Sequence, residues 1–183
     1  MLKDWCPVEV WLTILPRSRK RQAGLGIDVR RANRADARTI VDLVIALAKF
    51  ERLEPPDLEA ESRLVKDIFD RKLANVFVAK VERKLVGYAL YFYTYSSFLA
   101  RPTLYLEDIF VREDSRRRGV GEALFMRCVK EANRQGCGRM EWAVLTWNSK
   151  AMIFYEGLGA KRLEGQYVYR LDGEFLRHSD RIP

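Results

Sequence analysis

Three arginines and two glycines in the run Arg116 to Gly121 form a segment whose chemistry suits phosphate binding. An apolar, β-branched stretch at 104–111 precedes the run, and apolar residues at helical spacing follow it from Val120. The first N–H groups of a helix have no acceptor within the helix, and the helix dipole adds partial positive charge there. Glycines keep side chains away from these groups. The segment therefore predicts a seat for a pyrophosphate group.

Two common phosphate-binding motifs are excluded at this position. A Walker loop requires GxxxxGK[ST], and a dinucleotide fold requires GxGxxG after the strand, and neither pattern is present. The hexapeptide by itself also leaves a second interpretation open, a surface turn with a solvated arginine run.

A second segment with candidate functional residues begins about 25 residues later, at 147–160. Asn148 is a favourable helix N-cap, and apolar residues that include Phe154 and Tyr155 follow it. The segment ends on two glycines, Gly157 and Gly159, which is typical of a helix C-terminus. The apolar stretch at 140–145 predicts a strand before this helix.

Together the two segments resemble the coenzyme A motifs of the GNAT superfamily of N-acetyltransferases. The spacing Arg116-x-x-Gly119-x-Gly121 after a strand is similar to the family's coenzyme loop. The order of strand, Asn148, short helix, Phe-Tyr and Gly-x-Gly is similar to its second coenzyme motif. The match extends over residues 27–175, which is nearly the whole chain.

This resemblance implies that acetyl-coenzyme A is the cosubstrate and that no metal takes part. In the family the Asn bonds the pantetheine arm and the Tyr lies near the coenzyme sulfur, roles that fall here on Asn148 and Tyr155. The coenzyme-binding residues that we expect are Ile109, Phe110, Val111, Arg116, Arg117, Arg118, Gly119, Val120, Gly121, Glu122, Asn148, Ala151 and Tyr155.

Amine acetylation requires a proton acceptor, because an alkylammonium with a pKa near 10.4 is not a nucleophile. Glu107 and Asp108 lie in the strand beside the coenzyme loop. Adjacent strand residues face opposite sides, so only one carboxylate reaches the acetyl site unless a bulge intervenes. We expect Glu107 to be the base or to orient a water, and Tyr155 to protonate the departing sulfur. The alternatives are a loop or dimer contact for the carboxylate and a core position for Tyr155.

The substrate is indicated by a finer resemblance. Residues 47–57, 87–98 and 104–111 look similar to the spermidine/spermine and thialysine acetyltransferase branch, in which acidic side chains receive a cationic amine. The substrate-binding residues that this implies are Glu51, Glu54, Glu107 and Asp108. The chain departs from that branch at 96–98, where Ser-Ser-Phe replaces an acidic Asp-Pro-Trp.

We therefore expect an N-acetyltransferase that acts on a small polycationic amine, either a polyamine or a lysine-like molecule. Neither motif supplies a cysteine nucleophile, so we expect direct attack within a ternary complex. Three alternatives remain open: an acetyltransferase for protein N-termini or lysines, a non-catalytic coenzyme A-binding regulatory module, and a nucleic-acid-binding protein that uses the arginine runs.

Composition limits the class of protein further. The 183 residues suffice for one domain with a substantial core, and 48% hydrophobic residues exclude general disorder. No apolar run reaches the roughly 18 to 20 residues of a membrane span. Three cysteines and one histidine, His178, favour neither a disulfide framework nor a metal site, so a reducing cytoplasm is expected. The net charge of +8 gathers at 17–21 and 116–118, but no nucleic-acid motif accompanies it.

The expected architecture is α/β with the GNAT fold, a mixed, mostly antiparallel central sheet whose central strands splay apart and are flanked by helices. Residues 1–26 are expected to be an N-terminal extension, either a mobile tail or an added strand, and 27–183 the acetyltransferase domain, which we expect to form a homodimer. The expected strands are 27–31, 76–81, 85–95, 104–111, 140–145 and 167–171, and the expected helices are 33–50, 58–71, 120–132 and 148–159.

Overall fold

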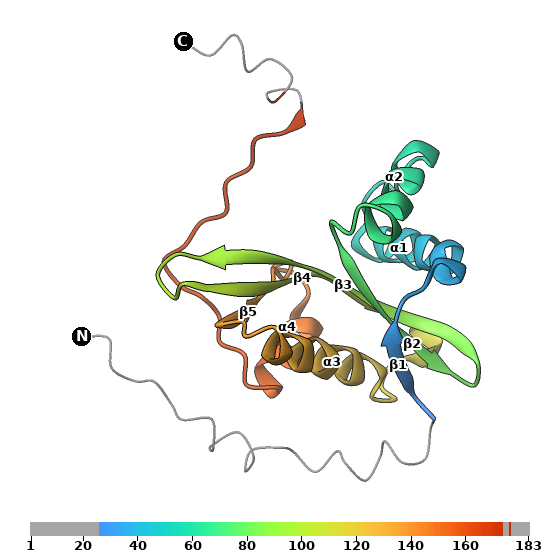
Figure 1. The fold of residues 1–183 in the computed structure, drawn as a ribbon. Helices are drawn as coiled ribbons and strands as arrows, with labels where there is room; N and C mark the ends of the chain where they lie inside the picture. The colour runs from blue at the N-terminus through green and yellow to red at the C-terminus, as the bar shows by residue number, and fades with distance from the viewer. Residues whose placement is uncertain (1–25, 174–175, 177–183) are drawn as a thin grey trace. The chain divides into compact units, whose positions relative to one another are not determined.

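The structure is a computed structural model that describes residues 26–173 and 176 of the 183-residue chain. Almost the whole expected N-terminal extension, residues 1–25, lies outside the described residues, as does His178. The chain divides into two units, which meet in the sequence between Ala143 and Val144. The first unit contains a five-stranded sheet with three α-helices, and the second contains one α-helix (Figure 1).

The helices and strands of the first unit follow one another in the order that the sequence predicts. Their bounds are β1 (Asp28–Arg31), α1 (Ala37–Glu51), α2 (Leu58–Phe69), β2 (Asn75–Val81), β3 (Lys84–Ser96), β4 (Arg101–Val111), α3 (Val120–Arg134) and β5 (Arg139–Glu141). The second unit contributes α4 (Ser149–Gly157). Two 3₁₀ turns, at Arg34–Asp36 and Glu113–Ser115, lead into α1 and α3. No helix in the described part of the chain is long and apolar enough to cross a bilayer.

The sheet has the order β1-β2-β3-β4-β5, with antiparallel pairs throughout except for the parallel pair of β4 and β5. β5 contacts β4 only over Thr103 to Tyr105. From Leu106 to Val111, the edge of β4 that faces away from β3 has no strand partner among the described residues. This open stretch is the splay that the sequence predicts.

Helices α1 and α2 lie on one face of the sheet and α3 lies on the other (Figure 1). The 3₁₀ turn that leads into α1 begins with a capping box, in which Asn33 accepts from the Ala35 N–H at 3.0 Å and Asp36 accepts from the Asn33 N–H at 2.8 Å. The core beneath α1 combines buried residues from both helices and three strands, namely Ile40, Leu43, Ile68, Val76, Val78, Tyr88, Leu90 and Phe110.

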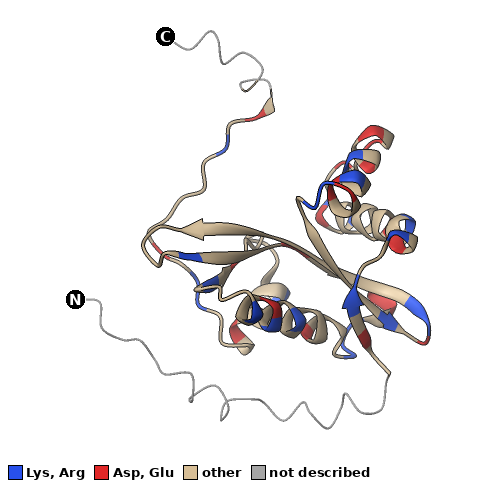
Figure 2. Ribbon diagram, in the orientation of Figure 1, with Lys and Arg blue, Asp and Glu red and all other residues tan. Residues whose placement is uncertain are grey.

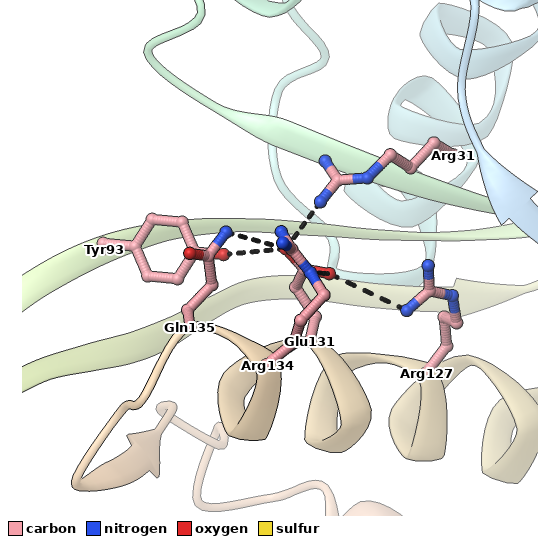
Figure 3. Close-up of polar contacts among 6 residues, drawn as sticks. All are labelled: Arg31, Tyr93, Arg127, Glu131, Arg134 and Gln135. Atoms are coloured by element: carbon pink, nitrogen blue, oxygen red, sulfur yellow. Dashed lines mark hydrogen bonds and ion pairs between the residues drawn. The ribbon is translucent and has the colours of Figure 1, made fainter.

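Helix α3 is anchored to the opposite face by a buried carboxylate, Glu131, near its C-terminus. Figure 3 shows the groups that surround it, which are Arg31, Tyr93, Arg127, Arg134 and Gln135. Hydrogen bonds from Arg134 hold the pKa of Glu131 at about 2 despite its burial, and Gln135 and Arg31 act in the same direction. Because Arg31 belongs to β1 and Tyr93 to β3, this cluster fixes the end of α3 against two strands.

In this region of the chain one predicted strand is shorter than expected and another prediction was wrong. The strand expected at 140–145 ends at Glu141, because β5 diverges from β4 and loses its partner. The segment 167–171 forms no strand, and Tyr167, Val168 and Tyr169 are exposed. An apolar run with strand composition forms a strand only where a neighbouring edge satisfies its backbone groups.

Candidate active site

The turn between β4 and α3 presents a helix N-terminus whose N-cap residue carries no capping side chain. Gly119 is the N-cap, with φ of 85°, and its side-chain-free backbone takes a left-handed conformation that strains other residues. Arg117 also has a positive φ, of 59°, and its side chain is exposed. The first helical hydrogen bond runs from the Ala123 N–H to the Gly119 carbonyl at 2.9 Å. The N-terminal end of α3 therefore has the geometry of an anion seat.

The three arginines of this turn differ in their surroundings. Arg116 points away from the helix end: its Nε donates to the Val111 carbonyl at 2.9 Å, and its guanidinium lies 4.7 Å from the Phe50 ring centroid and 5.5 Å from that of Phe110. Arg118 forms an ion pair of 3.5 Å with Glu82. Arg116 therefore links the turn to the end of α1 through its contact with the Phe50 ring.

The expected coenzyme contacts on β4 lie in its open stretch. Ile109, Phe110 and Val111 pair with β3 on one edge, while their other edge has no strand partner among the described residues. Backbone groups on such an edge are available to an extended polar ligand, as they are to an added strand. Phe110 itself is buried in the core beneath α1.

A β-bulge lies at the two adjacent carboxylates of β4. Leu90 of β3 pairs with Asp108 and the next residue, Tyr91, pairs with Leu106, so Glu107 is the extra residue. A bulge disturbs the alternation of side chains along a strand. Adjacent residues at a bulge therefore need not face opposite sides, which is the condition for both carboxylates to reach the acetyl site. Glu107 is exposed, Asp108 is partly buried, and the negative charge of Glu107 raises the pKa of Asp108.

Asp108 has the environment of a proton acceptor that works near neutral pH. Burial is the main cause that raises the pKa of Asp108 to about 6, and a hydrogen bond from the Tyr88 hydroxyl partly opposes it. The negative charges of Glu107 and Glu51 raise the pKa further. A carboxyl with this pKa is largely ionised at pH 7 and still basic enough to accept a proton.

Glu51, at the C-terminal end of α1, is the third carboxylate of this group. It is partly buried, and burial raises the pKa of its carboxyl. It acts electrostatically on both Asp108 and Tyr88. Glu54, the fourth expected substrate residue, lies exposed beyond the helix and is not among the charges that shift the pKa of Asp108. The structure therefore assembles three of the four predicted carboxylates.

An open hollow of about 670 Å³ lies between the end of α1 and the turn after β4. Its lining comes from α1, the end of β4 and the turn, and consists of Ala46, Lys49, Phe50, Phe110, Arg112, Glu113, Asp114 and Arg116. Three of these side chains are basic and two are acidic. The hollow adjoins the carboxylate group, since Phe50 precedes Glu51 and Phe110 follows Asp108 by two residues.

In the second unit, Asn148 caps α4 as the sequence predicts. Its side-chain oxygen accepts from the Ala151 N–H at 3.2 Å. Tyr155 is the buried residue of α4, and its ring centroid lies 5.1 Å from that of Phe154. Asn148, Ala151 and Tyr155 thus lie along one short helix that begins at the asparagine.

One residue of the site was missed at the level of the sequence. Tyr88 donates a hydrogen bond to Asp108 at 3.0 Å from a fully buried position in β3. Within the apolar, aromatic run 85–93 this tyrosine has nothing to distinguish it from a core residue. Asp108 was predicted as a substrate contact only, because its burial depends on the packing of α1.

No cluster of three or more metal-ligating side chains occurs among the described residues.

A search against protein-family models matches residues 43–160 to the acetyltransferase (GNAT) family. Thialysine N-epsilon-acetyltransferase of Bos taurus is 34% identical over 161 residues, which cover 81% of this chain and 94% of that protein. L-ornithine N5-acetyltransferase of Arabidopsis thaliana is 41% identical over 111 residues, which cover 61% of this chain and 46% of the relative.

Among solved structures, an integron cassette protein of V. cholerae superposes with a TM-score of 0.74 at 21% identity, over 87% of this chain and all of that one. This likeness shows the fold, and the family match together with the bovine relative shows the family. The chain belongs to the GNAT acetyltransferases.

Proposed function

We propose that this GNAT acetyltransferase transfers the acetyl group of acetyl-coenzyme A to a primary amine of a small substrate that carries more than one positive charge. The observation that carries the proposal is a group of three carboxylates: Glu107 and Asp108 on the stretch of β4 that leads toward α3, and Glu51 at the end of α1. Such a group favours cationic ligands.

The residues at the end of α3 fit the pyrophosphate of a coenzyme. Gly119 and Gly121 place no side chain at their two positions of the N-terminal turn, and Gly119 already has the φ that the turn needs. Arg117 and Arg118 would supply positive charge, whereas Arg116 would hold the turn in place. The open edge of β4 at Ile109 to Val111 would accept the pantetheine arm. Asn148 and Ala151 keep the coenzyme-binding role that the resemblance to the family's second motif implies. The coenzyme supplies an activated acetyl thioester.

The substrate class is supported by the relatives as well as by the carboxylates. Two relatives carry names that place the reaction on N-epsilon of thialysine and on N5 of L-ornithine. We propose that this chain likewise acetylates an amine that is remote from a second cationic group. Ser96, Ser97 and Phe98 stand where the polyamine branch carries an acidic residue, so both a polyamine and a lysine-like amine remain in the proposed class.

For the chemistry, we propose that Asp108 accepts the proton of the substrate ammonium and that Glu107 and Glu51 hold its second positive charge. Glu107, the base expected from the sequence, stays the alternative acceptor. The neutral amine then attacks the acetyl carbon directly within one ternary complex, so that the C–N bond forms and the C–S bond breaks. The nitrogen releases its second proton, which replaces the proton that Tyr155 gives to the sulfur. Tyr155 is the proposed proton donor to the departing sulfur, because a tyrosine hydroxyl is a hydrogen-bond and proton donor.

We also propose that the protein works as a homodimer in a reducing compartment. Cys128 is buried and Cys137 partly buried, and both are free thiols, which agrees with a reducing environment. Sedimentation equilibrium of the full chain measures the oligomeric state, and a mass that stays monomeric at micromolar protein contradicts the dimer.

A thiol-release assay with acetyl-coenzyme A tests the proposed function. The acceptors are a diamine, lysine, a monoamine of equal chain length, and a peptide with a free N-terminus. We expect the diamine or lysine to give the highest kcat/KM. Turnover with the peptide alone would indicate a protein acetyltransferase, and coenzyme binding without turnover on any acceptor would indicate a non-catalytic module.

A further inference from the structure

Tyr88 is a buried tyrosine whose hydroxyl has, among the described residues, one hydrogen bond, and this bond goes to the candidate base. It lies in β3, is fully buried, and packs in the core beneath α1 with Ile40, Leu43 and Phe110. Its hydroxyl donates to Oδ2 of Asp108 at 3.0 Å. Burying a hydroxyl is unfavourable unless it is hydrogen bonded, so the position needs the Asp108 carboxylate as its partner.

The contact also fixes one oxygen of Asp108 and leaves the other available. Oδ1 of Asp108 has no hydrogen bond to any residue that the structure describes. Tyr88 lies on the neighbouring strand inside a packed core. Its hydroxyl therefore has little freedom to move and keep the hydrogen bond if the Asp108 side chain adopts a different rotamer. The Asp108 carboxyl is therefore held by one oxygen at the core.

We propose that Tyr88 is a positioning residue for acetyl transfer, whose hydroxyl orients the Asp108 carboxylate and keeps it ionised so that it accepts the proton of the amine. This inference rests on the proposed function. The proton moves from the substrate ammonium to Asp108, which becomes a neutral carboxylic acid, and the amine keeps the electron pair with which it attacks. Asp108 later returns the proton to solvent.

The electrostatic surroundings give the direction of the effect. The titratable groups that act on Asp108 are Tyr88 from β3, Glu107 from the same strand and Glu51 from α1. Both glutamates and burial favour the protonated acid, and Tyr88 alone favours the carboxylate. Burial and the nearby carboxylates raise the pKa of Tyr88 itself, so it remains a hydrogen-bond donor throughout the working pH range.

Tyr88→Phe removes the hydroxyl and keeps the ring that packs in the core. We expect the acid limb of the kcat/KM profile to move from about 6 to higher pH, by about one unit, because a hydrogen bond to a charged group is lost. Activity should fall about tenfold below the limb and recover at alkaline pH. Tyr91→Phe is the matched control, since Tyr91 is also fully buried in β3 and its hydroxyl has no partner among the described residues.

A readout that needs no turnover separates this inference from the proposed function. Carboxyl carbon-13 NMR of aspartate-labelled protein, with the Asp108 signal assigned by its loss in Asp108→Asn, follows the titration of Asp108 directly. We expect the midpoint to rise in Tyr88→Phe and to stay unchanged in Tyr91→Phe.

Each outcome has a distinct meaning. An unmoved acid limb and an unmoved titration in folded Tyr88→Phe overturn the inference and leave the acetyltransferase standing. A lower melting temperature without either shift shows a purely structural tyrosine and also overturns it. A shifted titration in a protein that acetylates no amine overturns the proposed function, and the role of Tyr88 in transfer falls with it.

Discussion

At the scale of single residues, the bulge in β4 decides which carboxylate is buried and which is exposed. Glu107 is the unpaired residue and faces solvent, whereas Asp108 pairs with Leu90 and contacts Tyr88. Two chemically similar side chains at adjacent positions thereby acquire different environments. We assign proton transfer to the buried one and charge recognition to the exposed one, a division that their surroundings favour.

Substituting the two carboxylates separately tests this division. Asp108→Asn should lower kcat by about 100-fold or more, because it removes the proton acceptor, and should abolish the acid limb near pH 6. Glu107→Gln should raise KM for a diamine and keep the limb. Steady-state kinetics between pH 5 and about 9 makes the comparison, because this range covers the acid and the alkaline limbs of the pH–rate profile. A limb that disappears in Glu107→Gln and persists in Asp108→Asn would return the role of base to Glu107.

The anion seat is tested by placing a negative side chain on the glycine that caps α3. Gly119→Glu should abolish the rise in melting temperature that acetyl-coenzyme A produces in the wild-type protein. Gly136→Glu is the control, because Gly136 also has a positive φ, of 67°, and a side chain there meets no atom within 4 Å. It should cost some stability and leave coenzyme binding intact. Equal loss of binding in both variants would mean that backbone strain, and not the seat, is responsible.

At the scale of helices and strands, α3 links the seat at its N-terminus to the Glu131 cluster at its other end (Figure 3). Glu131→Gln leaves its arginines without their carboxylate. We expect a loss of about 2 to 3 kcal/mol in the free energy of unfolding, below the range for fully buried pairs because these arginines are partly exposed. Asp42→Asn, which breaks an exposed pair with Arg38, should cost no more than about 0.5 kcal/mol.

The same cluster predicts a pH dependence of stability. The folded-state pKa of Glu131, about 2, lies below its ordinary value of 4.5, so its contribution is complete above pH 4.5 and is lost as the pH falls toward 2. Urea unfolding at several pH values should therefore show wild type and Glu131→Gln converging across this window. A gap between them that stays constant down to pH 2 would refute the assignment.

Local patterns in the sequence predicted the elements that position the site, and long-range packing produced what they missed. The Asn33 cap, the glycine turn before α3 and the Asn148 cap each depend on neighbours within a few residues. The burial of Glu131 depends on Arg31, one hundred residues away. The bulge at Glu107 likewise depends on pairing with β3, and no residue type in the segment 104–111 indicates it.

At the scale of the whole molecule, net charge and site charge have opposite signs. The chain carries +8, and Figure 2 shows Lys and Arg on β1, on α3 and on other elements across the fold. A polycationic substrate is repelled by this average field and must be attracted locally by Glu51, Glu107 and Asp108. Removing one local charge should therefore affect a dication more than a monocation.

A competition assay tests this central claim most directly. Acetyl-coenzyme A is offered to a mixture of a diamine and a monoamine of equal chain length, and mass spectrometry measures the two N-acetyl products, whose ratio gives the ratio of kcat/KM. The account predicts an excess of acetylated diamine that shrinks toward equality in the double variant Glu51→Gln, Glu107→Gln, while coenzyme binding is unchanged. Equal products in the wild-type protein, or no product from either amine, would contradict it.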